Sequence, residues 1–221
     1  MATQRQSLEL MRKTQTSEVA KSPKVVALQK MFPTFSEFTI KVNPDIQHKI
    51  VENRMGMVEC ARRTEAPSLA LIKSSYGREA AETWICIQFE QLNAYAENGR
   101  GFTDLQIKEL SMLILNEYYF LNVYEVSLFI VNIKLGKYGE FFGAVGPMKI
   151  MTSLNKYVSE RRQALCIAET REEQERMERE REDSKKNSIT YEEYLRRKES
   201  GEFGNISQNT GHSDEKGGTQ C

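Results

Sequence analysis

The chain has 221 residues, of which 39% are hydrophobic, and this is enough apolar material for one core of ordinary domain size. Its 31 basic and 31 acidic side chains cancel, but they are unevenly spread. Residues 1–165 carry 21 basic against 17 acidic side chains, a balance of +4, and residues 166–221 carry 10 against 14. This composition excludes a strongly basic nucleic-acid binder and indicates a mildly basic body with an acidic tail.

No segment has the pattern of a secretory signal or a membrane helix. Residues 1–13 lack a run of seven or more apolar residues. The longest apolar stretch, 126–133, is far shorter than the roughly 20 residues that a membrane helix requires. The four cysteines are Cys60, Cys86, Cys166 and Cys221. Their spacing includes no Cys-x-x-Cys pair and no histidine at metal-ligand distance, which favours thiols in a reducing compartment. We therefore expect a soluble cytoplasmic protein.

The amino-terminal third predicts a flexible arm followed by short helices. Residues 1–22 are polar and are expected to form the arm. After a short apolar segment that Pro33 interrupts, we expect three side chains to pack on the core, namely Phe35, Phe38 and Ile40. Asn43-Pro44-Asp45 is typical of a helix start, and the helix is predicted to run to about Arg63. Its core face is expected to hold Ile46, Ile50, Met57 and Cys60.

The middle of the chain predicts three apolar helices. After a short helix at 69–72, Gly77 precedes a segment whose apolar residues recur at helical intervals, namely Trp84, Ile87, Leu92 and Tyr95. Thr103 with Gln106, and Asn122 with Glu125, form capping boxes that start the next two helices. The first of these is expected to bury Leu105, Ile107, Leu110, Leu113 and Ile114, and the second Val126, Phe129, Ile130 and Ile133.

The carboxyl-terminal part predicts a turn, a long helix and a tail. Gly136 suits a left-handed helix terminator, and a helix begins again at Pro147. Beyond 165 this helix has no apolar face but has opposite charges at i,i+4 spacing, as expected of a solvated extension over 166–186. The tail, 187–221, has a disordered composition except for a short helical motif at 190–199, which a third capping box of Thr190 and Glu193 begins. The sequence therefore predicts an all-α fold, with a compact bundle of about five to six helices over 23–165.

The chain offers no material for catalysis. It has two histidines, His48 and His212, and no nucleotide-binding loop. The carboxylates in its apolar helices occupy capping positions or solvated faces. We expect no catalytic residue, no cofactor and no metal, and hence a protein that is not an enzyme.

The turn after the second capped helix is the best candidate for contact with nucleic acid. Lys134 and Lys137 can meet phosphates, and Tyr138 and Phe142 can stack on exposed bases of single-stranded DNA. In the alternative interpretation, the aromatic side chains close the ends of neighbouring helices. A helix-turn-helix interpretation of 103–135 is weaker, because the second helix has hardly any arginine with which to read base edges.

The motif at 190–199 is the best candidate for contact with another protein. Its small apolar face consists of Tyr191, Tyr194 and Leu195. A short helix with such a face and no core of its own either docks on a partner or folds back on the body of the protein.

Residues 117–163 resemble a group of small helical proteins from Bacteroides-type bacteria and their phages or mobile elements. The shared pattern is Glu125 at the start of an apolar helix, Lys134-x-Gly136-x-Tyr138-Gly139, Phe142-Gly143, and a helix that ends in Tyr157 and Glu160-Arg161. The resemblance implies no function of its own. The layout of a small helical body with a charged tail is also similar to phage helicase loaders of the type that lacks an ATPase.

These observations favour a non-enzymatic accessory protein of a phage or mobile element. We expect it to act in DNA replication as a helicase-loader-like adaptor that binds a partner protein. A replicative helicase would fit the role of this partner, and single-stranded DNA is expected as a further ligand. The alternatives are a structural or assembly protein that forms an oligomer, and a DNA-binding regulator. The sequence does not define the oligomeric state.

Overall fold

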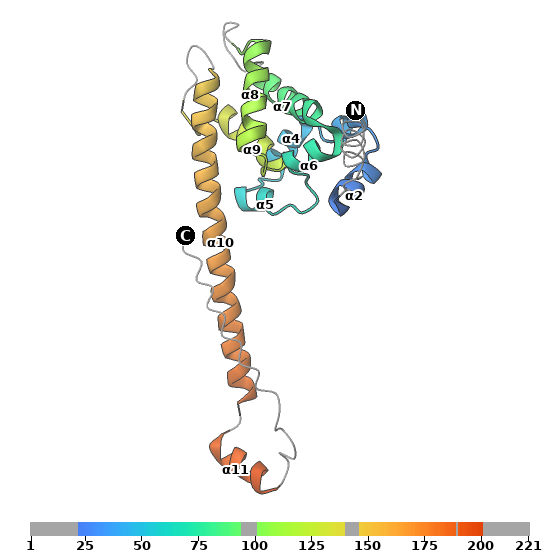
Figure 1. The fold of residues 1–221 in the computed structure, drawn as a ribbon. Helices are drawn as coiled ribbons and strands as arrows, with labels where there is room; N and C mark the ends of the chain where they lie inside the picture. The colour runs from blue at the N-terminus through green and yellow to red at the C-terminus, as the bar shows by residue number, and fades with distance from the viewer. Residues whose placement is uncertain (1–21, 94–100, 140–145, 189, 201–221) are drawn as a thin grey trace, which may run out of the picture. The chain divides into compact units, whose positions relative to one another are not determined.

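The computed structural model describes residues 22–93, 101–139, 146–188 and 190–200 (Figure 1). Every regular element in these ranges is an α-helix, so the predicted all-α class is confirmed. The chain divides into unit 1, which ends at Ser159, and unit 2, which begins at Glu160. The arm and the last part of the tail that the sequence predicts lie outside the described residues.

Unit 1 begins with two short helices, α2 (Pro23–Met31) and α3 (Phe35–Lys41). Phe38 is fully buried, and Phe35 packs against the same core, so both predictions are confirmed. Ile40 is 66% exposed, so its predicted burial is wrong. It lies two residues after Phe38, and residues two apart lie on different sides of a helix.

One predicted helix is two helices in the structure. The helix expected to reach Arg63 is divided into α4 (Asp45–Glu52) and α5 (Met57–Ala61). Between them Arg54 has a φ of 50°, in the left-handed region, and the backbone amide of Met55 donates back into the end of α4. This turn buries the Met55 side chain, which a continuous helix would not place in the same position. The expected core residues Ile46, Ile50 and Cys60 are buried, and Met57 packs against them half-buried.

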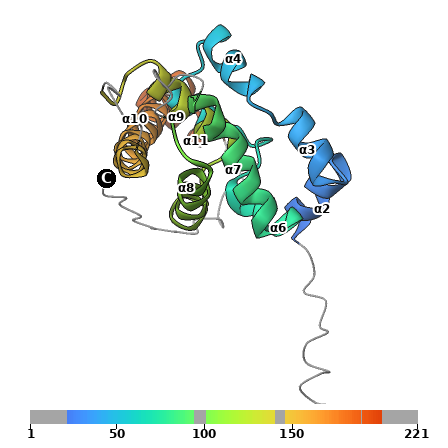
Figure 2. The same ribbon diagram turned by 90° about the horizontal axis from the view of Figure 1, so that it is seen from above.

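The centre of unit 1 is α7 (Arg78–Asn93), which follows α6 (Leu69–Tyr76) after Gly77. It packs against α6 and against the two helices that come after it (Figure 2). Trp84 on α7 is fully buried, and its indole Nε1–H donates to the carbonyl of Val42, with an N–O distance of 2.7 Å.

The first predicted capping box is present at the start of α8 (Asp104–Glu117). The Thr103 hydroxyl accepts from the amide of Gln106, and the Gln106 side chain accepts from the amide of Thr103. Of the expected core residues, Ile107, Leu110 and Ile114 are buried. Leu105 and Leu113 are exposed, so their predicted burial is wrong: the core covers the opposite side of α8.

The second predicted capping box begins α9 (Val123–Lys134), which packs against α4, α5 and α7. The Asn122 side chain accepts from the Glu125 amide, and the buried Glu125 carboxylate accepts from the Asn122 amide. The four expected core residues of α9 are all buried, namely Val126, Phe129, Ile130 and Ile133.

The last two helices are α10 (Pro147–Asn187) and α11 (Tyr191–Glu199). α10 starts at the predicted proline and continues without a break into the charged segment. Its buried residues, Ile150, Ser153, Leu154 and Tyr157, all belong to unit 1. None of the described residues after Tyr157 is buried.

Candidate macromolecule-binding sites

A tight turn follows α9, as the glycines predict. Gly136 and Gly139 have φ values of 72° and 95°, in the left-handed region that favours glycine. The amide of Lys137 donates to the carbonyl of Asn132, with an N–O distance of 3.0 Å, and closes the end of the helix. The turn therefore holds Lys137 and Tyr138 directly beside the last turn of α9.

Lys134 is engaged within unit 1. Its ammonium Nζ donates to the side-chain oxygen Oε1 of Gln47 on α4, with an N–O distance of 2.8 Å. Burial lowers the pKa of Lys134 below its usual value. Gln47 is buried and in turn donates to Gln88 on α7, at 3.4 Å. Lys134 thus belongs to a polar contact that joins three helices.

Tyr138 lies half-buried between the core and two lysines. Its ring centroid is 5.8 Å from that of Phe129, with an interplanar angle of 40°. The ammonium groups of Lys137 and Lys156 lie over the same ring, 5.6 Å and 5.8 Å from its centroid. The structure therefore brings Lys137 and Tyr138 together as the sequence suggests and adds Lys156 from α10. Phe142 lies outside the described residues.

Sequence reasoning missed Lys156. The residue is exposed and lies in the helix that Pro147 begins, 18 positions beyond Tyr138 in the chain. Its neighbour Tyr157 is fully buried and packs against Phe129, with ring centroids 5.6 Å apart. The apolar pattern of α10 could have indicated that Lys156 lies beside a buried aromatic residue. It could not have indicated that the turn after α9 brings Tyr138 to the same place.

A groove of about 430 Å³ lies beside Lys134, between α4, α7 and α9. Its apolar residues are Pro44, Val51, Val131 and Leu135, and its ionisable residues are Asp45, His48, Glu52 and Lys134. No sequence motif marks it, because its walls come from three separate segments of the chain. Because the groove carries both positive and negative side chains, its charge does not favour one class of ligand.

The docking motif predicted in the tail is a helix with an exposed aromatic face. Thr190 caps α11 by accepting from the amide of Glu193, which is one half of the predicted capping box. The rings of Tyr191 and Tyr194 are stacked, with centroids 6.4 Å apart. Tyr191 is 74% exposed, and Tyr194 and Leu195 are 41% and 38% exposed. The structure therefore gathers the three predicted residues on a helix that buries none of them.

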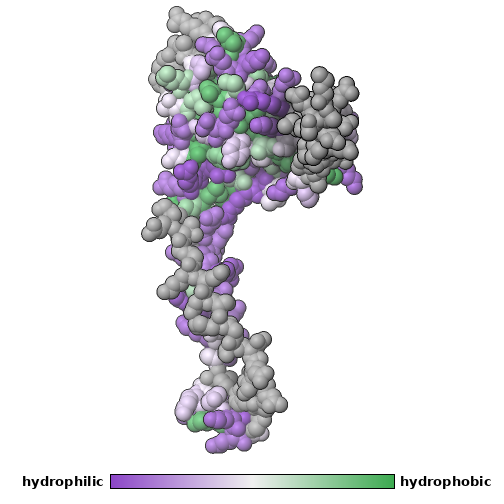
Figure 3. Space-filling model, in the orientation of Figure 1, coloured by the Kyte–Doolittle hydropathy of each residue, from purple (hydrophilic) through white to green (hydrophobic). Residues whose placement is uncertain are grey.

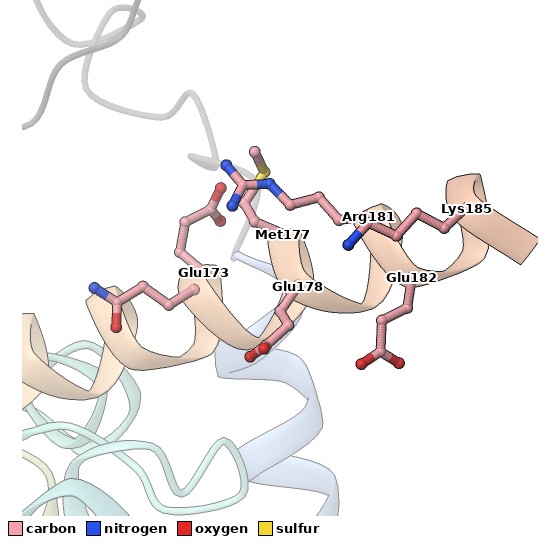
Figure 4. Close-up of a pocket in the computed structure, with 7 residues that line it drawn as sticks. Glu173, Met177, Glu178, Arg181, Glu182 and Lys185 are labelled. Atoms are coloured by element: carbon pink, nitrogen blue, oxygen red, sulfur yellow. The ribbon is translucent and has the colours of Figure 1, made fainter.

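The part of α10 in unit 2 is a charged helix without an apolar face. Arg176 pairs with Glu173 and Glu180, one turn away on either side. In Figure 4 the side chain of Arg181 extends back along α10 toward Met177 and Glu173, while Glu178 and Glu182 point to another side. The hollow drawn there is lined, among the described residues, by α10 alone. A surface formed by one helix does not enclose a ligand, and we assign no site to it.

The described residues offer little reactive chemistry. No group of three or more His, Cys, Asp and Glu side chains within them could hold a metal ion. Cys60 and Cys86 are free thiols. Burial raises the pKa of the Cys60 thiol to about 12, which keeps it protonated and unreactive. Within the same residues, no helix has the length and apolar character that crossing a bilayer demands.

Part of the chain matches a known protein family. A family of unknown function, DUF6633, matches residues 104–203, which include α8, α9, α10 and α11. No curated protein and no solved structure matches the chain. The part of the chain that is similar to this family begins at the first residue of α8 and extends past the end of α11.

Proposed function

We propose that the chain is a non-enzymatic accessory protein of a phage or mobile element, and that it acts in DNA replication as a helicase-loader-like adaptor. It binds a partner protein through α11. The single observation that carries the docking role of α11 is the extent of the family match, which continues through the charged half of α10 and through α11. Those segments bury no side chain, so core packing does not explain why related proteins share them.

The exposed face of α11 supports docking on a protein. Tyr191, Tyr194 and Leu195 lie three and four residues apart, so they share one side of the helix. Lys198 continues the same side, seven residues after Tyr191. Tyrosine is enriched among the residues that dominate protein interfaces, and a short helix with such a face fits a hydrophobic groove.

The non-enzymatic part of the proposal rests on the chemistry of the described residues. Within the described residues, the buried carboxylate of Glu125 is occupied by its capping hydrogen bond, and the Cys60 thiol is held protonated. His48 is exposed on α4. Among its described lining residues, the groove beside Lys134 has His48 and two carboxylates but no Ser, Thr or Cys.

The partner-binding part can be tested by changing the α11 face in the full-length protein. The variant Tyr191→Ser/Tyr194→Ser/Leu195→Ser removes the apolar face, and Glu192→Gln/Arg196→Gln is a charge-neutral control on another side of α11. Binding to the replicative helicase encoded by the same genome is measured by biolayer interferometry. We expect the triple variant to weaken binding at least about 30-fold and the control to leave it within about twofold. Equal binding by all three proteins would contradict the role of α11.

The proposal extends to single-stranded DNA at the turn after α9. Lys137 and Lys156 supply two exposed positive charges beside Tyr138. Lys134 contributes less, since its ammonium is half-buried and bound to Gln47. Binding of a fluorescein-labelled oligomer of 20 thymidines, measured by anisotropy in 20 mM and 200 mM salt, tests this part. We expect binding that weakens as salt rises; no binding at 20 mM salt would remove nucleic acid from the proposal.

An assembly role is the second candidate, and the outer side of α8 favours it. Five large hydrophobic side chains there and in the following turn are at least 39% exposed: Leu105, Met112, Leu113, Tyr119 and Phe120. Figure 3 shows hydrophobic surface over this helix. Light scattering distinguishes the two candidates, because a stable oligomer without affinity for helicase or DNA would favour assembly. We do not propose a sequence-reading regulator, because α9, the second helix of the helix-turn-helix interpretation, buries most of its residues, Ser127 among them.

A further inference from the structure

The two lysines beside Tyr138 come from different segments of the chain and meet at its ring. Lys137 comes from the turn after α9 and Lys156 from α10, 19 residues later. Both ammonium groups lie over the Tyr138 ring, at 5.6 Å and 5.8 Å from its centroid. The negative face of an aromatic ring attracts cations, so the ring holds two positive charges near each other that would otherwise move apart.

The same arrangement leaves Tyr138 poorly placed to stack on a base. The ring packs against Phe129 of the core, with centroids 5.8 Å apart. A base that stacked on Tyr138 would have to displace an ammonium group from the ring and lose the attraction that holds it. The hypothesis drawn from the sequence, in which Tyr138 is a platform for bases, therefore conflicts with the occupied surroundings of the ring.

We propose that Lys137 and Lys156 form a phosphodiester-binding site and that Tyr138 is the positioning residue between them. The ligand class is the sugar-phosphate backbone of a single strand, read without regard to base. Since each ammonium lies within 6 Å of the same centroid, the two charges are less than 12 Å apart, which fits contacts to phosphates one or two nucleotides apart. This inference rests on the proposed single-strand binding and replaces base stacking as its mechanism.

The decisive probe is an oligomer without bases. In 20 mM salt, anisotropy compares 20 thymidines with 20 abasic deoxyribose phosphates, both carrying the same label. We expect the two dissociation constants to agree within about threefold, because the phosphates provide the affinity. If the thymidine oligomer binds and the abasic one is weaker by about tenfold or more, the inference is overturned and Tyr138 is a base platform. If neither binds, the proposed function loses its nucleic-acid part and this inference fails with it.

Variants distinguish the contributions of Lys137, Lys156 and Tyr138 to binding. Lys137→Gln/Lys156→Gln is expected to weaken binding of both oligomers about tenfold and to reduce the slope of log K against log salt by about 1.4, since each single-strand phosphate contact contributes about 0.7. The matched control Lys24→Gln/Lys30→Gln removes two exposed charges from α2. It should change neither quantity; an equal loss in the control would overturn the site.

Two substitutions of Tyr138 test the role of its aromatic ring. Tyr138→Phe keeps the aromatic face and should bind both oligomers like the wild type. Tyr138→Leu keeps apolar packing on Phe129 but removes the π-face, and it should weaken both oligomers equally, about threefold, without altering the salt slope. A loss confined to the thymidine oligomer would contradict a positioning role. Fluorescence of Trp84, the only tryptophan, reports whether each variant is folded.

Discussion

The side-chain amide of Asn122 donates to the backbone carbonyl of Cys60, with an N–O distance of 2.9 Å, while its side-chain oxygen caps α9. One buried residue therefore connects the end of α5 with the start of α9, 62 positions apart. The backbone beside it is joined as well, since the Leu69 amide donates to the Leu121 carbonyl at 2.9 Å. This junction fixes the start of α9 against α5 and α6.

Replacing Asn122 by Ala should destabilise unit 1 by about 2–4 kcal/mol. The change removes a helix cap, which is worth about 1 kcal/mol, and leaves the Cys60 carbonyl without the Asn122 donor in a buried site, which costs about 1–3 kcal/mol more. Asn122→Ser keeps an oxygen for the cap and should lose about half as much. Urea unfolding followed by Trp84 fluorescence measures both. Equal losses of unfolding free energy for the Ala and Ser variants would show that the cap does not contribute to stability.

The buried thiol of Cys60 predicts a loss of stability at alkaline pH. Its pKa is raised from 9.0 to about 12 in the folded protein, chiefly by burial, with the nearby Glu59 carboxylate adding to the effect. The unfolded chain therefore releases this proton first, and the stabilising contribution is complete below pH 9 and is lost as pH rises toward 12. Between pH 8 and pH 10 the free energy of unfolding should fall by about 1.4 kcal/mol through this group.

The control for the Cys60 prediction is Cys60→Ala, which cannot ionise. Its stability is lower at every pH because it loses a buried side chain, but it should decline less between pH 8 and pH 10 than the wild type does. Parallel declines in the two proteins would contradict the assignment to Cys60.

Gly136 should be sensitive to any added side chain for reasons of backbone geometry alone. Its φ is 72°, and a Cβ placed there would meet no atom within 4 Å. Gly136→Ala is expected to cost about 1–2 kcal/mol, because the left-handed conformation is unfavourable for Ala. Gly136→Asn should cost less, since Asn tolerates this region better. A larger loss for Asn than for Ala in urea unfolding would argue against backbone strain.

A chain that ends after Ala168 should keep the stability of unit 1. None of the described residues after Tyr157 is buried, so the removed part contributes no core packing. We expect the thermal midpoint, measured by Trp84 fluorescence, to stay within about 2 °C of the full-length value. A decrease of about 5 °C or more would mean that residues after Ala168 stabilise the helical unit.

The features predicted well from the sequence depend on neighbours in the chain. The capping boxes at Thr103 and Asn122 follow from residues three positions apart, and Gly136 follows from the end of an apolar pattern. Such signals are local, so they indicate where helices begin and end without knowledge of the fold.

The features that were missed depend on distant contacts. α8 has apolar residues on two sides, and its sequence does not say that the core covers Ile107 and leaves Leu105 exposed. The break before Met55 follows from the place that its side chain takes in the core. In the candidate site, the contact of Lys134 with Gln47 spans 87 positions, so no local pattern separates this lysine from Lys137.

Hydrogen exchange of the full-length protein, with and without the replicative helicase of the same genome, tests the central claim most directly. None of the residues of α11 is buried, so its amides should exchange rapidly in the free protein. If α11 is the docking helix, peptides that cover Tyr191–Glu199 will exchange at least about tenfold more slowly when helicase is present, and the Tyr191→Ser/Tyr194→Ser/Leu195→Ser variant will show no slowing. Unchanged exchange in α11 with saturating helicase would contradict the account.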